Sequence, residues 1–216
     1  MNSPLRIGID CDGVLSDTMP AWVRFFNRAD HPHDNINALI NSDKWESPEV
    51  ICPNCFQGIL NDYDATLDCD VFPDTSRYVQ SLAALADLVF ISHRLPSVEQ
   101  ATHDWLALHQ IDTCFDKFLF GHQNKAVAAF FECLSYHIDD SPNVAKDFHE
   151  LDIHLRTKKV PEDRIPKLLL IDRPYNQHSS CYIRFPNLAG PGGAAEFLLA
   201  TLAEAAASAT NIADAA

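Results

Sequence analysis

Short apolar runs alternate with helical patterns along this chain, and this alternation limits the possible folds more than any other feature. The runs are short and largely apolar, as buried strands are, and the segments between them carry apolar residues at helical spacing. Five runs are expected to be strands, with a sixth candidate near the C-terminus: 5–9, 88–92, 115–121, 136–140, 167–172 and 181–185. This order predicts an α/β fold, in which helices cover both faces of a parallel sheet.

The helices expected between these strands are defined by apolar residues at helical spacing. The residues of these stripes are Trp22, Phe25, Phe26 and Ala29; Val79, Leu82, Ala83 and Ala86; Val98, Ala101, Trp105 and Leu108; Ala126, Val127, Phe130, Phe131 and Leu134; Val144, Ala145, Phe148 and Leu151; and Phe197, Leu198, Thr201, Leu202 and Ala205. Asp74 or Thr75 is expected to cap the second of these helices. Ser141 and Pro142 form a typical start for the fifth.

The stretch from 30 to 73 breaks the regular pattern. It is rich in Asn, Asp, Pro and Cys, and its aromatic residues are scattered. A chain of 216 residues suits one domain that carries a subdomain. We therefore expect a Rossmann-like core formed by residues 1–29 and 74–216, and a small cap formed by residues 30–73.

Polar side chains stand where three of the predicted strands end, at Asp10, at Ser92 and at Asp139 with Asp140. The carboxyl ends of parallel strands meet at one edge of a sheet, where ligands bind. Together with Asp12, the acids at this edge would repel one another unless some are protonated or a cation lies among them. Oxygen ligands without His or Cys favour Mg²⁺. A Mg²⁺ site with a lysine and a serine nearby is typical of phosphoryl transfer.

The acidic composition of the chain disfavours some classes of binding partner. The chain has 16 basic and 30 acidic residues, a formal net charge of -14, which disfavours binding of nucleic acid polymers and of anionic membranes. A small anionic substrate would need a local positive group or a metal. No phosphate loop of the G-x-x-x-x-G-K-[ST] kind is present in the sequence, which disfavours a kinase of that type.

Localisation is predicted from what the sequence lacks. The N-terminus shows no signal pattern, and no apolar run approaches the roughly 20 residues of a membrane helix. Seven cysteines at irregular spacing argue against a disulfide framework. We expect a soluble, cytoplasmic protein, and the sequence gives no indication of its oligomeric state.

Four motifs identify a family. "DCDGVLSD" at 10–17 resembles the D-x-D-G-[TV]-L signature of the haloacid dehalogenase-like (HAD) phosphohydrolases. "VFISH" at 89–93, "GHQNKAVAAF" at 121–130 and "HIDDSPN" at 137–143 are similar to the other three motifs of that superfamily and occur in the same order. The resemblance covers about residues 5–150.

The resemblance implies a covalent mechanism. Asp10 would be the nucleophile and form an aspartyl-phosphate. Asp12 would protonate the leaving oxygen, then take a proton from the hydrolytic water, while its backbone carbonyl faces the metal. Gly13 would permit a tight turn after it.

The remaining motifs imply phosphate and metal contacts. Ser92 and Lys125 would bind the phosphoryl group, and Lys125 would also neutralise the nucleophile. Asp140 corresponds best to a direct Mg²⁺ ligand and Asp139 to a supporting one. His93 and Arg94, which follow Ser92, could contact phosphate or face solvent.

A second resemblance is narrower. "LLLIDRPYNQ" at 168–177 is similar to the strand and D-x-P-Y-N ending of the 5′(3′)-deoxyribonucleotidases, the type C nucleotidases, which also carry a small cap after the first motif. It implies a nucleoside 5′-monophosphatase. A base could then stack on cap aromatics such as Trp45, Phe56 and Tyr63, and Arg173 could offer a cation to phosphate or sugar.

Other interpretations stay open. The chain could be a phosphatase for another small phosphomonoester, such as a sugar phosphate, or a catalytically idle HAD binding module. The intact set of motif residues argues against the idle module. "CPNC", with Cys52 and Cys55, is half of a zinc knuckle that the "HPH" of 31–33 and Cys69 could complete, or it is a buried or disulfide-capable pair.

Overall fold

The computed structural model describes residues 5–18, 20–21, 62–121, 124–179 and 183–213. Several sequence predictions lie outside these residues. They are most of the helix expected at 18–29, the cap aromatics Trp45 and Phe56, and the proposed zinc ligands at 31–33, Cys52 and Cys55. The boundaries of the cap, 30–73, therefore stay a prediction.

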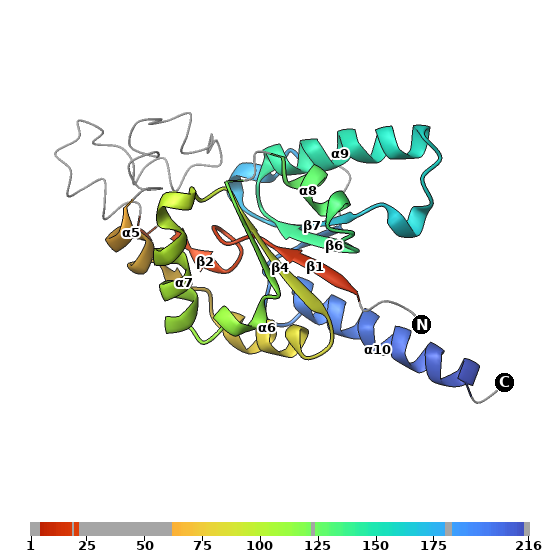
Figure 1. The fold of residues 1–216 in the computed structure, drawn as a ribbon, viewed down its shortest axis with the longest axis horizontal. Helices are drawn as coiled ribbons and strands as arrows, with labels where there is room; N and C mark the ends of the chain where they lie inside the picture. The colour runs from red at the N-terminus through yellow and green to blue at the C-terminus, as the bar shows by residue number, and fades with distance from the viewer. Residues whose placement is uncertain (1–4, 19, 22–61, 122–123, 180–182, 214–216) are drawn as a thin grey trace.

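A six-stranded sheet with the strand order β5-β4-β1-β6-β7-β8 forms the centre of the molecule (Figure 1). Its strands are β1 (Arg6–Ile9), β4 (Asp87–Ser92), β5 (Lys117–Phe120), β6 (Tyr136–Asp139), β7 (Lys167–Ile171) and β8 (Ile183–Phe185). Every neighbouring pair is parallel. The predicted parallel sheet is confirmed, and β8 confirms the sixth candidate strand.

The sheet is buried on both faces, since successive side chains of a strand point to opposite sides. In β4, Leu88 and Phe90 belong to one apolar cluster, whereas Val89 and Ile91 belong to another. The same alternation occurs in β7. This explains why these strands are continuous apolar runs rather than alternating ones.

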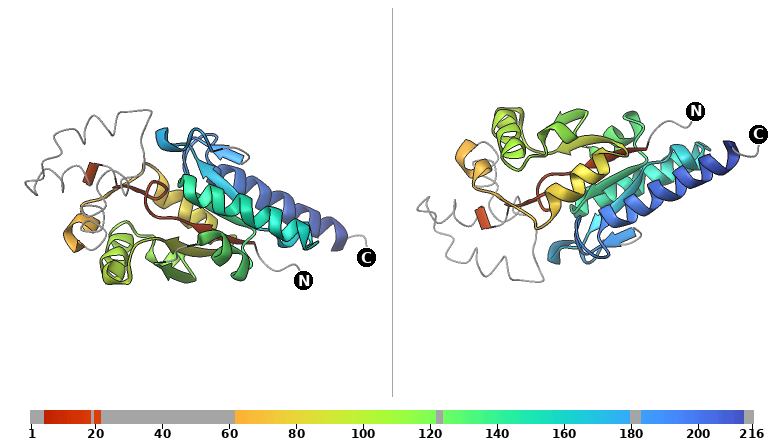
Figure 2. Two further views of the ribbon diagram at one scale, coloured as in Figure 1. Left: turned by 90° about the horizontal axis from the view of Figure 1, so that it is seen from above. Right: turned by 90° about the horizontal axis from the view of Figure 1, so that it is seen from below.

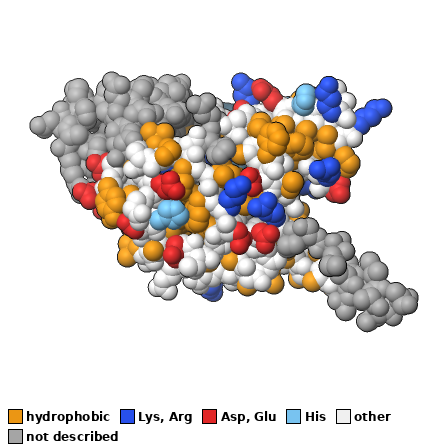
Figure 3. Space-filling model, in the orientation of Figure 1, with side chains coloured by type: hydrophobic (Ala, Val, Ile, Leu, Met, Phe, Trp, Pro, Cys, Tyr) orange, Lys and Arg blue, Asp and Glu red, His pale blue; other side chains and the backbone are white. Residues whose placement is uncertain are grey.

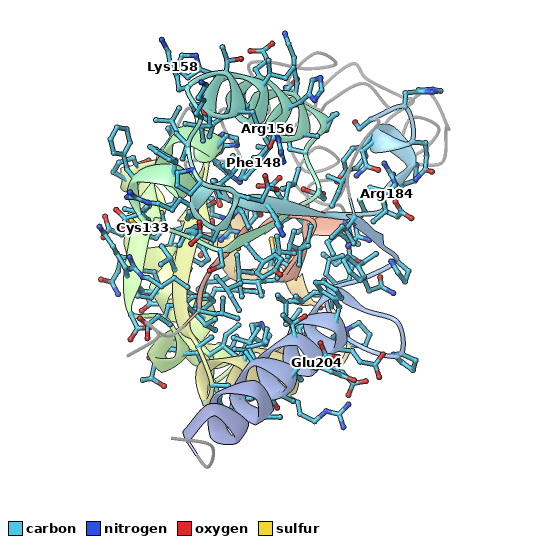
Figure 4. All side chains as sticks on the ribbon, turned by 90° about the vertical axis from the view of Figure 1, so that its right-hand side faces the viewer. Cys133, Phe148, Arg156, Lys158, Arg184 and Glu204 are labelled. Atoms are coloured by element: carbon cyan, nitrogen blue, oxygen red, sulfur yellow. The ribbon has the colours of Figure 1, made fainter. Side chains whose placement is uncertain are left out.

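Among the described residues, five helices cover the two faces: α6 (Thr75–Ala83), α7 (Glu99–Leu108), α8 (Lys125–Phe131), α9 (Pro142–Thr157) and α10 (Ala194–Ala213). α8 and α9 pack together over one face, and α6 and α10 pack together over the other (Figures 1 and 2). Phe148 points from α9 toward the sheet (Figure 4). Short 3-10 turns complete the described core: η1 (Pro96–Val98), η2 (Asp112–Cys114), η3 (Glu162–Arg164) and η4 (Pro174–Asn176).

Some predicted helix stripes are wrong in detail. Val127, Phe131 and Leu108 are exposed rather than buried. α8 instead packs on the sheet through small residues, Ala126 and Ala129, because a short helix lying close to the sheet leaves little room. Apolar side chains gather over α8 and α9 on the face shown in Figure 3.

The predicted helix caps differ in outcome. Ser141 caps α9 as expected, and its hydroxyl accepts a hydrogen bond from the Val144 amide. Asp74 occupies the cap position of α6, but its backbone is left-handed, with φ 61°, and its side chain makes no capping hydrogen bond. Thr75 is already the first helical residue. The predicted cap position of Asp74 is confirmed, but its side chain does not cap the helix and lies instead 3.6 Å from the guanidinium of Arg77.

A small second sheet joins the two segments that border residues 22–61. β2 (Ser16–Asp17) pairs antiparallel with β3 (Asp70–Val71). The helix α5 (Tyr63–Leu67) before β3 lies beside α7. The indole of Trp105 on α7 donates a 2.7 Å hydrogen bond to the carbonyl of Cys69, which fixes this segment to the core.

Among the described residues, no helix combines the length and the apolar character that crossing a membrane requires.

Candidate active site

The carboxyl ends of three neighbouring strands bring the predicted site residues together. Asp10 follows β1, Ser92 ends β4, and Asp139 ends β6 with Asp140 after it. All four side chains are buried. Strands β4, β1 and β6 are adjacent in the sheet, so their ends meet at one edge.

Lys125 links two of these acids. Its ammonium lies 2.7 Å from Oδ1 of Asp10 and 2.9 Å from Oδ2 of Asp139. Burial acts to lower the pKa of Lys125, but Asp10 and Asp139 outweigh it and raise that pKa above its ordinary value. A lysine in the first turn of a helix is disfavoured by the helix dipole. The two carboxylates offset this cost and keep Lys125 charged.

Asp139 is bound by three donors. Lys125 and the Nε2 of His137 both bond Oδ2, the latter at 3.0 Å, and the amide of Ser141 donates to Oδ1 at 2.8 Å. Burial would raise the pKa of Asp139, but the charge of Lys125 and the hydrogen bond from His137 hold it below its ordinary value. These contacts suit a residue that orients Lys125.

His137 is a site residue that the sequence analysis did not single out. Its ring stacks on Phe148 with 5.6 Å between centroids, and it lies over Gly8. A Cβ at Gly8 would lie 2.6 Å from Nδ1 of His137, so this strand position needs glycine. The signal in the sequence was the glycine inside a predicted strand, which marks a close approach.

Gly13 forms the tight turn after Asp12. Its φ is 78°, a conformation that favours glycine. A side chain there would also collide with the carboxylate of Asp140. The glycine thus lets the loop after β1 approach the loop after β6.

A metal site fits the acids at this edge. Asp10, Asp139 and Asp140 each offer a carboxylate oxygen, and these atoms lie within 4.8 Å of one another. Burial raises the pKa of Asp10 well above its ordinary value, although Lys125 opposes the shift. Burial and the charge of Asp139 raise the pKa of Asp140 to about 7. A divalent cation would relieve this repulsion, and carboxylate oxygens are the ligands that Mg²⁺ prefers.

The two residues after Ile91 have different environments. Ser92 is buried, and its hydroxyl oxygen accepts a 3.1 Å hydrogen bond from the amide of Arg94, which leaves its proton to donate. His93 is exposed. Although the residue as a whole is exposed, partial desolvation of its ring and the charge of Lys125 lower the pKa of His93 to about 4, so its ring is neutral at pH 7.

Arg94 binds the carboxylate of Asp12. Its Nη2 lies 2.7 Å from Oδ1, and its Nε lies 3.0 Å from Oδ2. The guanidinium is buried, whereas Asp12 is partly exposed. Burial disfavours the charge of Arg94, but Asp12 raises its pKa further. The sequence analysis left Arg94 undecided between phosphate and solvent, and it faces neither.

Arg173 buttresses the turn after Asp12. Its Nε and Nη2 donate to the carbonyl of Gly13, the former at 3.1 Å, and its Nη1 donates to the carbonyl of Asp172 at 3.0 Å. Its guanidinium also lies 4.7 Å from the ring centroid of Phe72. Four hydrogen bonds from the Arg173 guanidinium go to backbone carbonyls, so its first role here is to hold this turn, and the suggestion that it offers a cation to phosphate or sugar stays a prediction.

The rest of this loop supports Asp140. The side-chain amide of Asn176 donates to the backbone carbonyls of Asp140 and Ile171, at 2.8 and 2.7 Å. The hydroxyl of Tyr175 donates to Oδ2 of Asp140. Arg184, which is labelled in Figure 4, lies on β8. It donates to Oδ1 of Asn176 at 2.8 Å. The loop after β7 thus holds the loop after β6 in place.

The family of the chain is decided by sequence comparison. A family model described as "5' nucleotidase, deoxy (Pyrimidine), cytosolic type C protein" matches residues 3–189. The chain belongs to this family. A comparison with curated proteins found no match.

Several solved structures similar to this nucleotidase-family chain are described as HAD hydrolases or have a fold of that kind. A haloacid dehalogenase-like hydrolase from Streptococcus pneumoniae is 14% identical, with 85% of this chain and 95% of that chain covered and a TM-score of 0.52. CbbY from Rhodobacter sphaeroides, solved with phosphate, is 14% identical over 89% and 98% of the chains, with a TM-score of 0.51. The putative HAD-hydrolase YfnB from Bacillus subtilis, solved with magnesium, is 12% identical over 79% and 89%, with a TM-score of 0.50.

These likenesses confirm the HAD fold that the sequence motifs predicted. Together with the family match, they make the chain an HAD-type phosphatase of the 5′-nucleotidase family.

Proposed function

We propose that this protein is a Mg²⁺-dependent phosphomonoesterase that forms an aspartyl-phosphate on Asp10. The observation that carries the proposal is the buried ion pair between Lys125 and Asp10, beside Asp139 and Asp140. Three buried acids with one lysine leave excess negative charge, which suits a divalent cation. Asp10, Asp140 and the backbone carbonyl of Asp12 would hold the ion, with Asp139 in support.

The proposed chemistry has two halves. In the first, a carboxylate oxygen of Asp10 attacks phosphorus, the bond to the ester oxygen breaks, and Asp12 gives that oxygen a proton. In the second, water attacks phosphorus, the bond to Asp10 breaks, and Asp12 takes the proton from the water. A bound Mg²⁺ would neutralise negative charge on the phosphoryl group.

The phosphoryl group would be held by side chains already in place. Ser92 keeps a hydroxyl proton to donate, and Lys125 supplies a positive charge next to the nucleophile. The neutral ring of His93 adds no charge but could form a hydrogen bond. The phosphate bound to CbbY and the magnesium bound to YfnB, two proteins of similar fold, support this arrangement.

The substrate we propose is a nucleoside 5′-monophosphate, deoxy forms included. The description of the family supports it, as does the loop of residues 172–176, whose D-x-P-Y-N sequence resembles that of type C nucleotidases. A cap of about residues 30–73 would close over the nucleoside. We propose a cytoplasmic location on the same family description.

A substrate panel tests this function. The value of kcat/KM is measured with Mg²⁺ for nucleoside 5′-monophosphates beside sugar phosphates and phosphoglycolate, with Asp10→Asn as the matched inactive control. We expect a nucleotide to be the best substrate. If the best nucleotide falls about tenfold or more below another phosphomonoester, roughly 1.4 kcal/mol of barrier, the nucleotidase assignment fails. If no phosphomonoester is turned over, the chain is an idle binding module.

A further inference from the structure

Arg94 holds Asp12 by two parallel hydrogen bonds. Nη2 lies 2.7 Å from Oδ1 and Nε lies 3.0 Å from Oδ2. A two-point contact between a planar guanidinium and a carboxylate fixes the orientation of the carboxylate as well as its position. Asp12 is the residue to which the proposed function assigns proton transfer, so its orientation matters.

Arg94 is itself held by the core. Its Nη1 donates to the hydroxyl of Thr102 on α7 at 3.2 Å, and that hydroxyl donates to the carbonyl of Val98 at 2.9 Å. The guanidinium carbon lies 6.0 Å from the ring centroid of Trp105 on the same helix. Only 3% of the Arg94 side chain is exposed. The guanidinium therefore has a fixed position against α7.

We propose that Arg94 is a positioning residue, which orients Asp12 for proton transfer and does not bind the phosphoryl group. This inference rests on the proposed function and deepens it. Nε and Nη2 are directed at Asp12, Nη1 is directed at Thr102, and burial leaves little of the group for an anion. Ser92 and Lys125 are the groups placed for the phosphoryl oxygens.

The test compares two leaving groups. The first substrate is an alkyl phosphate, chosen as the best substrate of the wild-type protein among nucleoside monophosphates and other alkyl phosphomonoesters. Its leaving oxygen needs a proton. p-Nitrophenyl phosphate does not, because nitrophenolate is a stable anion. The value of kcat/KM covers steps up to phosphoryl transfer, so it isolates the proton donation of the first half-reaction.

Arg94→Lys and Arg94→Met should each show a split between these substrates. We expect kcat/KM to fall about 10- to 100-fold for the alkyl phosphate, which is less than most of the 10²–10⁴ that a general acid supplies because Asp12 is misoriented and not removed, and by less than about threefold for p-nitrophenyl phosphate. Asp12→Asn should show the same split, as the positive control. Thr102→Val removes the partner of Nη1 of Arg94 and should show a weaker split between the two substrates. This variant keeps Arg94 in place, so it tests the inference even if the Arg94 variants misfold.

A matched negative control is Arg156 on α9 (Figure 4). It also binds a carboxylate, that of Asp152, but through Nε alone, and it is exposed on the surface. Arg156→Met should leave both values of kcat/KM within about twofold of the wild type, because an exposed ion pair contributes little.

Two results would overturn the inference. Equal losses on both substrates, with weaker inhibition by inorganic phosphate, would mean that Arg94 binds the phosphoryl group. No loss on either would mean that the pair with Asp12 is structural. A wild-type protein that turns over neither substrate would instead refute the proposed function, and this inference with it.

Discussion

The ammonium of Lys125 lies 2.7 Å from the carboxylate of Asp10, and both side chains are buried. A buried pair of this kind is costly to break from one side, because the remaining charge is left without a partner. Asp139 shares the same lysine at 2.9 Å. Lys125 therefore determines both the charge balance of the site and the state of the proposed nucleophile.

Lys125→Met should abolish turnover and destabilise the fold by about 3–5 kcal/mol, because two buried carboxylates lose their cation. Lys117→Met is the matched control, since Lys117 pairs with Glu132 at 2.6 Å but is 45% exposed. That change should cost at most about 1 kcal/mol. Urea unfolding of both variants measures the difference, and equal losses would contradict the importance given to the buried pair.

Gly13→Ala should reduce both activity and stability. An alanine at φ 78° is strained, and its Cβ would collide with Asp140. Gly192→Ala separates the two causes, because Gly192 has φ 71° but no atom within 4 Å of the added Cβ. Both changes should lower the free energy of unfolding by about 1–2 kcal/mol through backbone strain. Gly13→Ala should lower it further because of the collision, and this variant alone should lose phosphatase activity. Similar unfolding free energies would argue against the collision.

Stability should fall in mild acid partly through His109. Desolvation lowers the pKa of His109 in the folded protein, where its Nε2 is buried and its ring meets the edge of Trp105. The unfolded chain then binds the proton more tightly, so this contribution is full above about pH 6.5 and is lost as the pH falls toward the folded value. His109→Gln should flatten the dependence of unfolding free energy on pH in that window. An unchanged slope would contradict this.

Turnover should require Mg²⁺. Chelation by EDTA should abolish activity and added Mg²⁺ should restore it, because Asp10, Asp139 and Asp140 form the proposed site. Ca²⁺ should inhibit, since its larger and looser coordination would misplace the nucleophile and the phosphate. Full activity after exhaustive chelation would refute the metal site.

The sequence predicted the parts of the site that depend on strand ends. A parallel sheet brings the residues after its strands to one edge, so the prediction of parallel strands that end at Asp10, Ser92 and Asp139 was enough to place these residues at the same edge. Lys125 followed from a motif of the family that the sequence resembles.

Other parts depend on packing that no local pattern contains. The burial of Arg94 depends on α7, through Thr102 and Trp105. The orientation of Arg173 toward the carbonyl of Gly13 joins positions 160 residues apart. Val127 was expected inside because it is apolar, but the helix packs on the sheet through alanines instead.

The most direct measurement is to trap the phosphoryl group. The protein is mixed with substrate and Mg²⁺, quenched in acid, and digested, and the phosphorylated peptide is located by mass spectrometry. The account predicts phosphate on Asp10, and turnover by Asp10→Asn at least about tenfold below the wild type, or 1.4 kcal/mol of barrier. Phosphate on another residue, or an Asp10→Asn variant that keeps activity within that factor, would contradict the covalent mechanism.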